Sequence, residues 1–322
     1  MKPNNSRFLR ANLFCALVAV AATLFCSSAQ KKQGEPERKA YLRGIYLPVR
    51  KGPDLRDLNY IKAVVARSKP LGINAMVLDV QSFQGHKNKT NPEVVAYLKA
   101  EKIHTVARVV CFEGGIGKFP VPQARLDALA ALVEEVAQQG YDEVQLDYIR
   151  FADSGVRVSL TRKYEFLDKF MATMREITNR HGVKLSADIF GRIVYNKNDS
   201  IGQNLENFAK HTDVIYPMLY PSHFTADKKR LSDPGFTMKE GTEKALDRLP
   251  GKSTEIMPWV QCFVYNIQHA RVNLTQYVVL QVQAVEKTAA RGWVAWNAKG
   301  DYKELYQALE KINAVAAPAG KT

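Results

Sequence analysis

The sequence is poor in cysteine and has no long apolar run, and both shortages exclude classes of protein. It holds four cysteines in 322 residues. Two of them precede residue 30, so Cys111 and Cys262 can form one disulfide at most in the rest of the chain. A disulfide scaffold is therefore excluded, and stability must come from an apolar core, for which the chain is long enough. The apolar run Ala11–Phe25 is shorter than the roughly 20 residues that a spanning helix needs.

Motifs of several reaction classes are also missing. No serine stands in a Gly-x-Ser-x-Gly elbow, and no histidines or cysteines have metal-ligand spacing, so serine esterase and zinc hydrolase chemistry lack support. The first predicted strand ends in Leu47-Pro48-Val49 without the glycine-rich phosphate turn that an open nucleotide-binding sheet usually carries. Gly114–Gly117 is interpreted as a flexible loop. We therefore expect neither a cofactor nor a metal.

The amino-terminal segment has the features of an export signal. Basic residues precede the apolar run, and the small residues Ser27 and Ala29 follow it. This pattern predicts a signal peptide over residues 1–29, cleaved after Ala29, and a periplasmic or extracellular location without stable membrane insertion. Lipoprotein anchoring at Cys26 ranks second, because Phe25 is bulky for the preceding position. Residues 30–40 have almost no apolar side chains and are predicted to form a flexible leader.

The chain is basic, with a formal net charge of +14. Its lysines and arginines are spread along the predicted helices and do not cluster with aromatic residues on one element, which disfavours nucleic acid as a partner. Solubility, or attraction to anionic polymers and surfaces, explains the charge better.

Short apolar runs alternate with longer amphipathic segments from residue 41 onward, which predicts eight βα units. Eight units in about 250 residues or a little more match a single (β/α)₈ TIM-type barrel, here over residues 41–322, in the α/β class. The predicted strands are Arg43–Leu47, Ala75–Val80, Thr105–Phe112, Glu143–Ile149, Lys184–Phe190, Val214–Leu219, Ile256–Phe263 and Trp293–Trp296. The predicted helices are Leu55–Lys69, Pro92–Lys99, Gln123–Gln139, Arg162–His181, Gly202–Lys210, Met238–Leu249, Leu274–Ala290 and Tyr302–Ala314.

Three acidic residues interrupt the apolar strands near their carboxyl ends, which form the catalytic face of such a barrel. They are Asp79 in the second strand, Asp147 in the fourth and Asp188 in the fifth. Each must either have a function or form a salt bridge, for example to Arg108 or Arg150, because an unpaired buried carboxylate is costly. For Asp79 the two interpretations are equal, for Asp147 function is favoured, and Asp188 lies between them.

Two of these acids could hydrolyse a glycosidic bond. The reaction needs a proton donor for the leaving oxygen and a second carboxylate that acts as nucleophile or base. Asp147 and Asp188, on adjacent strands, could supply both, because two close negative charges raise the pKa of one carboxyl and keep it protonated. The sequence leaves open which of them is the acid.

Aromatic side chains accompany the acids and offer flat faces for stacking on sugar rings. We expect Trp293 to fill the barrel, and Tyr220 and Trp296, at or beyond their strand ends, to contact a ligand. His223 follows the sixth strand and could bind a substrate hydroxyl or act as an acid, although a loop histidine is often only solvated. The strand-end aromatic residues are Tyr46, Tyr148, Phe151, Phe190, Tyr216, Tyr220, Trp259, Trp293 and Trp296.

The segment Asp142–Phe151 resembles the fourth-strand motif of a family of exported barrels described as glycoside hydrolases, of the domain of unknown function 4015 type. Further segments resemble the family's other blocks in the same order, from Tyr41 to about Tyr302. The resemblance implies a glycosidase-like site on a barrel without identifying the substrate. These segments are Leu185–Gly191, Ile201–Gln203, Tyr216–His223, Pro258–Gln261 and Gly292–Asn297.

The chain departs from the family pattern in two places. Cys262 stands where an acidic residue is expected after the seventh strand, so a supporting carboxylate is missing there. Phe112–Gly115 replaces a basic-acidic pair and a longer loop, which puts the substrate contacts of that loop in doubt.

Three functions remain open. The leading one is a glycoside hydrolase that uses Asp147 and Asp188 on a polysaccharide or oligosaccharide outside the cytoplasm. The alternative is a carbohydrate-binding barrel without catalysis, which the Cys262 departure makes plausible. A binder of anionic polymers that uses the basic surface ranks third. The expected substrate contacts are Asp79, Tyr148, Arg150, Tyr220, His223, Trp259, Gln261, Trp296 and Asn297.

Overall fold

The computed structural model describes residues 40–49, 52–81 and 87–316. The predicted signal peptide, residues 1–29, and all but the last residue of the predicted leader, residues 30–40, lie outside the described residues. Within the described ranges, no helix is both long and apolar enough to cross a membrane.

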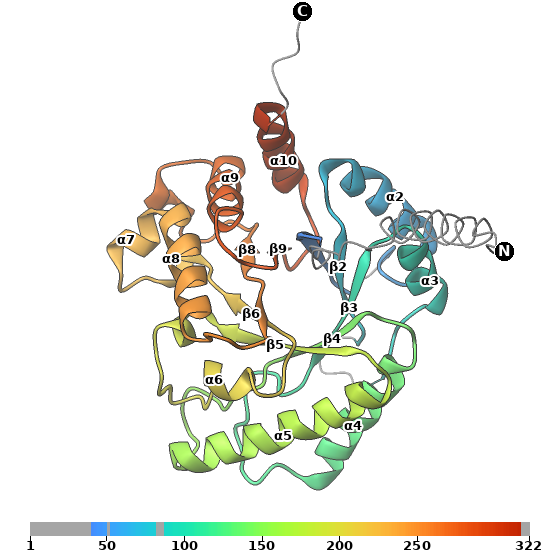
Figure 1. Cartoon of the computed structure of the whole chain (residues 1–322), viewed down its shortest axis with the longest axis vertical. Helices are drawn as coiled ribbons and strands as arrows, with labels where there is room; N and C mark the ends of the chain where they lie inside the picture. The colour runs from blue at the N-terminus through green and yellow to red at the C-terminus, as the bar shows by residue number, and fades with distance from the viewer. Residues whose placement is uncertain (1–39, 50–51, 82–86, 317–322) are drawn as a thin grey trace, which may run out of the picture. The chain divides into compact units, whose positions relative to one another are not determined.

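The described chain forms the predicted (β/α)₈ barrel, with parallel strands inside and helices around them (Figure 1). The strands are β1 (Leu42–Leu47), β2 (Ala75–Asp79), β3 (His104–Val110), β4 (Glu143–Asp147), β5 (Lys184–Phe190), β6 (Val214–Met218), β7 (Glu255–Ile256), β8 (Trp259–Gln261) and β9 (Gly292–Trp296). The helices are α2 (Leu58–Ser68), α3 (Pro92–Ala100), α4 (Gln123–Ala137), α5 (Leu160–Arg180), α6 (Leu205–Phe208), α7 (Lys228–Ser232), α8 (Pro234–Asp247), α9 (Leu274–Val285) and α10 (Lys303–Ala316).

The predicted seventh strand, Ile256–Phe263, is divided into β7 and β8. β7 pairs with β6, whereas β8 pairs with β9 on the other side. Pro258 lies between the two pieces and has no N–H to donate to a ladder, so the strand breaks there. The segment Glu255–Gln261 thereby joins β6 to β9 and closes the ring.

Two apolar layers hold the barrel together, one between strands and helices and one inside the ring. The prediction that Trp293 fills the ring is wrong. Trp293 packs in the outer layer, and its Nε1 donates to Glu286 at the end of α9, 3.2 Å away. Alternate residues of a strand face opposite sides, so Val294 points into the ring and its neighbour Trp293 points out. Trp259 of β8 lies in the inner layer instead and is fully buried.

Helix starts follow local capping chemistry, which explains their positions. The side chains of Asp57, Asn91, Ser159 and Asn273 each accept a backbone N–H in the first turn of the helix that follows. The short helix α7 was not predicted, because it has only five residues and no apolar period to reveal it. Cys111 and Cys262 follow β3 and β8, and both are free and buried, so the one possible disulfide does not form.

The closure of the ring depends on a close approach at Gly292. A Cβ atom added there would lie 2.0 Å from the backbone oxygen of Leu42 in the neighbouring strand β1. We expect Gly292→Ala to lower the free energy of unfolding by about 2–3 kcal/mol, because a backbone atom cannot move away as a side chain can.

Urea denaturation of purified protein measures this change. Gly117→Ala is the matched control, since no atom lies within 4 Å of its added Cβ, and it should leave stability almost unchanged. Equal midpoints for the two variants would contradict the packing of β9 on β1.

Candidate active site

Strand register brings the predicted acids to one face of the barrel. Leu146 of β4 pairs with Ala187 of β5, so Asp147 and Asp188 follow at the next step of neighbouring strands. Asp79 at the end of β2 pairs with Arg108 of β3. All four side chains therefore stand near the carboxyl ends of consecutive strands, where barrels of this class place their chemistry.

Arg108 joins two of the acids. Its Nη1 lies 2.5 Å from Asp79 Oδ1, and its Nη2 lies 2.5 Å from Asp147 Oδ2, which also accepts from Nε at 3.1 Å. The guanidinium also lies over the rings of Tyr46 and Trp296. Burial lowers the pKa of Arg108, but the two carboxylates outweigh it and raise that pKa well above its usual value. Arg108 therefore stays charged inside the barrel.

Tight hydrogen bonds also fix Asp79 and Asp147. The Tyr46 hydroxyl donates to Asp79, and the backbone N–H of Tyr148 donates to Asp147 Oδ1 at 2.6 Å. Tyr148 has a φ of 57°, a left-handed conformation that a tyrosine rarely adopts. Such strain often marks functional positions. The Tyr148 side chain lines the cavity described below.

Asp188 stands in a different environment. Its Oδ1 accepts from Trp259 Nε1 at 2.7 Å, and its Oδ2 is buried without a hydrogen-bond partner among the described residues. Burial raises the pKa of Asp188 well above its usual value, and the negative charge of Asp147 raises it further, against smaller lowering effects of Arg108 and Trp259. Burial therefore favours the protonated form of Asp188 more than that of an exposed aspartate, and its Oδ2 stays without a hydrogen-bond partner among the described residues.

The two acids line a cavity of about 220 Å³ at this face. Its walls combine charged groups with flat apolar ones, the combination that binds a polar ligand with ring faces. Tyr46 stacks on Trp296 with ring centroids 4.0 Å apart, which holds that wall in place. The cavity is lined by Arg108, Asp147, Tyr148, Arg150, Asp188, Phe190, Met218, Tyr220, Trp259 and Trp296.

A second cavity of about 300 Å³ shares the residues Phe190, Met218 and Tyr220 with the first. Its other walls include Arg192 and His223. The His223 residue is exposed; its Nδ1 lies 3.0 Å from the Ser222 hydroxyl, and desolvation by the surrounding atoms lowers its pKa. The two cavities are therefore neighbours that meet at Phe190, Met218 and Tyr220.

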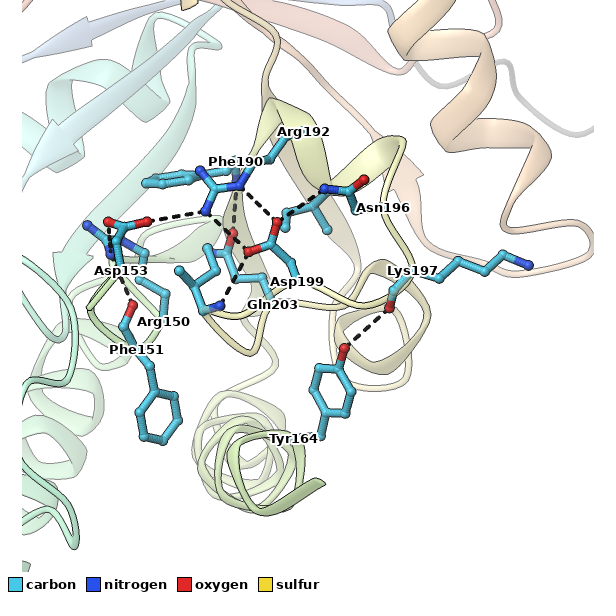
Figure 2. A network of polar contacts seen from close by, with 12 residues as sticks. Arg150, Phe151, Asp153, Tyr164, Phe190, Arg192, Asn196, Lys197, Asp199 and Gln203 are labelled. Atoms are coloured by element: carbon cyan, nitrogen blue, oxygen red, sulfur yellow. Dashed lines mark hydrogen bonds and ion pairs between the residues drawn. The ribbon is translucent and has the colours of Figure 1, made fainter. Parts of the chain in front are cut away.

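Gln203 ties the ends of β4 and β5 together. Its side chain is buried, its Nε2 lies 3.3 Å from the carbonyl oxygen of Asp188 and 3.4 Å from that of Ile149, and its Oε1 accepts from Phe190 N at 2.9 Å. Figure 2 shows Gln203 beside the ion pairs that Arg192 forms with Asp153 and Asp199. Gln203 therefore fixes the strand ends that carry Asp147 and Asp188.

Not every residue expected to contact substrate lines a cavity. Asp79 lies behind Arg108. Gln261 is fully buried, and its Nε2 donates to the carbonyls of Phe263 and Tyr265, so it holds the following loop. The Asn297 side chain donates to the carbonyl of Cys262 at 2.7 Å. These three residues support the site from outside the cavity walls.

The two departures from the family pattern have different consequences. Cys262 packs in the outer apolar layer, so its side chain does not face the site. Its replacement of an acid therefore removes no group from the cavity. Phe112 and Glu113 line a separate cavity of about 330 Å³ with Arg125. The sequence analysis did not single out Arg192 and Met218, which line the site, although Arg192 directly follows the segment Leu185–Gly191 and Met218 lies within Tyr216–His223.

The partner of Asp147 also differs from one of the alternatives considered above. Arg150 forms an ion pair with Asp153 at 3.2 Å and not with Asp147. The ion-pair partner of Asp147 is Arg108. Among the described residues, no group of three or more histidine, cysteine, aspartate or glutamate side chains could hold a metal ion.

Removing the Arg108 charge should strongly destabilise the barrel. Arg108→Gln leaves Asp79 and Asp147 buried without a cation, so we expect the free energy of unfolding to fall by about 3–5 kcal/mol. Arg67→Gln, which breaks an exposed ion pair with Glu310, is the control and should cost less than about 1 kcal/mol. Chemical denaturation of both variants measures the difference. Similar losses would show that the buried ion pairs do not stabilise the fold.

Known structures share this fold at low sequence identity. The glycoside hydrolase domain of PgaB (BpsB) from Bordetella bronchiseptica is similar with a TM-score of 0.62 and 12% identity, over 85% of this chain and 99% of that one. The chitinase of Chromobacterium violaceum gives 0.57 and 14%, over 85% and 99%. The Group IV chitinase of Ostrinia furnacalis gives 0.58 and 10%, over 87% and 100%. At such identities the likeness shows the barrel fold alone.

A family assignment comes from the sequence itself. No curated protein matches it. Residues 121–302 match the family described as "Putative glycosyl hydrolase domain", and this range contains Asp147, Asp188 and most of the cavity walls. Because the match spans more than half of the chain, the protein belongs to this family of glycosyl hydrolase domains.

Proposed function

We propose that the protein hydrolyses O-glycosidic bonds with Asp188 as proton donor and Asp147 as the second carboxylate. The observation that carries the proposal is the contrast between the two acids in one cavity. Three N–H groups, two from Arg108 and one from Tyr148, donate to Asp147, an arrangement that suits a carboxylate. No cation among the described residues forms an ion pair with Asp188, and burial raises its pKa well above the usual value, which favours a proton donor. Glycosidic cleavage needs this combination of one protonated and one ionised carboxyl group.

The steps follow from these states. Asp188 donates its proton to the leaving oxygen as the bond to the anomeric carbon breaks. Asp147 stabilises the positive charge that develops on the sugar, either by attacking the anomeric carbon or by taking a proton from the attacking water. Trp296 and Tyr220 in the walls offer faces for the sugar rings.

The substrate class proposed is a polymer that contains amino sugars, cleaved outside the cytoplasm. Structures with the same fold support this choice, since they include chitinases, and one tobacco chitinase was solved with the oligosaccharide NAG4 (TM-score 0.51, 14% identity). Two neighbouring cavities of about 220 and 300 Å³ offer places for more than one part of such a chain. The predicted signal peptide supports action after export. Incubation of the mature protein with a panel of glycan polymers, followed by an assay for new reducing ends, tests the proposal.

Asp188→Asn is the variant that best separates catalysis from stability. The amide cannot donate the proton of a carboxylic acid, so turnover should fall by orders of magnitude. Its oxygen can still accept from Trp259, and it carries no charge to bury, so the fold should persist. Hydrolysis rates and thermal melts on the same samples measure both effects. A folded Asp188→Asn protein with full activity would remove Asp188 from the mechanism.

Asp147→Asn should also lose turnover, because the amide is neither a nucleophile nor a base. It leaves Arg108 paired with Asp79 alone, so some stability is lost as well, and binding of glycan should remain. Activity must therefore be compared at a temperature where melts show the variant to be folded. Loss of activity that only tracks unfolding would contradict the catalytic role.

The pH dependence of stability and rate should reflect the raised pKa of Asp188. The folded state binds this proton more tightly than the unfolded chain, so its stabilising effect is full below the ordinary aspartate pKa and is lost as pH rises through the raised value. Asn at position 188 mimics the protonated form. The melting temperature of Asp188→Asn minus that of the natural protein should therefore increase with pH. The hydrolysis rate of the natural enzyme should fall over the same pH range, as Asp188 loses its proton. A constant difference in melting temperature at all pH values would contradict a protonated Asp188.

A further inference from the structure

Two arginines stand along the cavity walls, and the Asp147–Asp188 mechanism uses neither. Arg150 lines the first cavity and is 7% exposed, and Arg192 lines the second. Phe190 separates them, with the guanidinium carbons 4.9 Å and 4.8 Å from its ring centre. Phe190 itself belongs to both cavities. The two cations therefore lie on either side of the junction between the cavities.

The charge of Arg150 is poorly compensated for so buried a group. Among the described residues its ion pair is with Asp153 alone, at 3.2 Å, and the Asp153 side chain is 63% exposed. Its Nε is buried and has no hydrogen-bond partner. Arg108 contrasts with it, since two close carboxylates neutralise that arginine. A buried cation with an unused donor at a cavity wall is complementary to an anion in the cavity.

Asp153 already shows that a carboxylate fits between the two guanidinium groups. Its Oδ2 lies 3.2 Å from Arg150 Nη1, and its Oδ1 lies 3.3 Å from Arg192 Nη2. Figure 2 shows this bridge, with Asp199 holding Arg192 from the far side through Nε at 2.8 Å and Nη2 at 3.2 Å. Both contacts of Asp153 are long for charge-assisted hydrogen bonds, so they can yield to a ligand.

We propose that Arg150 and Arg192 recognise a carboxylate on a sugar bound at the junction of the two cavities. The preferred substrate is then an acidic glycan, in which the carboxylate-bearing ring lies beside the bond that Asp147 and Asp188 cleave. The net positive charge, +14 for the full chain and 43 − 32 = +11 without residues 1–29, attracts such a glycan from a distance. The placement of the carboxylate beside the cleaved bond rests on the proposed glycosidase function. The preference for binding an acidic glycan does not depend on it.

Binding calorimetry on matched ligands tests the preference without any need for turnover. One pair is a hexuronate oligosaccharide and its carboxyl-reduced form, and the other is an N-acetylmuramic acid-containing oligosaccharide and its carboxyl-reduced form. The two members of a pair differ only in one group, which is a carboxylate in the acidic member and a hydroxymethyl group in the reduced one. This group is C6 in the first pair and belongs to the lactyl ether in the second. We expect the acidic member of one pair to bind at least about tenfold more tightly, the effect of one charge-assisted hydrogen bond. The pair that shows it identifies the source of the carboxylate.

Three variants connect the preference to these residues. Arg192→Gln, at a half-exposed position, should abolish most of the acidic preference and leave binding of the reduced member unchanged. Arg157→Gln is the matched control: it removes the same charge from an exposed arginine that lines neither cavity, and the preference should remain. Asp153→Asn should increase affinity for the acidic member severalfold, because it removes the carboxylate that competes for both guanidinium groups.

The outcomes separate this inference from the proposed function. Equal binding of acidic and reduced members in both pairs overturns it, even when glycans are hydrolysed. Loss of preference in Arg157→Gln as large as in Arg192→Gln also overturns it, because the effect would then be one of general charge. An acidic preference without release of reducing ends supports the recognition site and contradicts the hydrolase.

Discussion

The site depends on one buried cation. Arg108 reaches from β3 to the acids of β2 and β4, so three consecutive strands share a single charged cluster inside the ring. Without it, two carboxylates would stand in an apolar interior at a cost of several kcal/mol. With it, Asp147 is held by donors on two sides and cannot rotate toward Asp188. A strand-end acid could be a salt-bridge partner or a functional group. Asp79 is a salt-bridge partner of Arg108, whereas Asp147 is a salt-bridge partner of Arg108 that also lines the cavity.

The same cluster explains why the two cavity acids differ. Arg108 forms an ion pair with Asp147, and its charge also lowers the pKa of Asp188. Burial outweighs that effect and raises the pKa of Asp188 well above its usual value, and the only hydrogen bond given to this carboxyl among the described residues is the neutral N–H of Trp259. The placement of one arginine on β3 therefore gives the two cavity acids different surroundings.

The sequence predicted the barrel well because strand alternation depends on local apolar patterns, which the parallel sheet buries on both faces. It failed where tertiary context decides. Trp293 was assigned to the interior, but side-chain parity in β9 is set by the register with β1, which no local pattern reveals. Arg108 was a candidate partner, yet its pairing with both Asp79 and Asp147 depends on distances between strands. The roles of Gln261 and Asn297 as loop supports were hidden for the same reason, since a polar residue at a strand end can face the cavity or a backbone carbonyl.

The arrangement of charge along the site separates cleavage from recognition. Asp147, Asp188 and Arg108 lie on strands, where backbone ladders and Gln203 fix their positions, as a reaction that tolerates little misplacement requires. Arg192 lies just beyond β5, and Asp153 lies in the loop after β4, where one exposed carboxylate holds two cations by long contacts. Loops of a barrel can change without disturbing the strands. Under the proposed function, substitution at Asp153 or Arg192 would alter which glycan is bound, whereas substitution at Arg108 would alter whether the barrel is stable at all, because Arg108 compensates two buried carboxylates and Asp153 is an exposed loop residue.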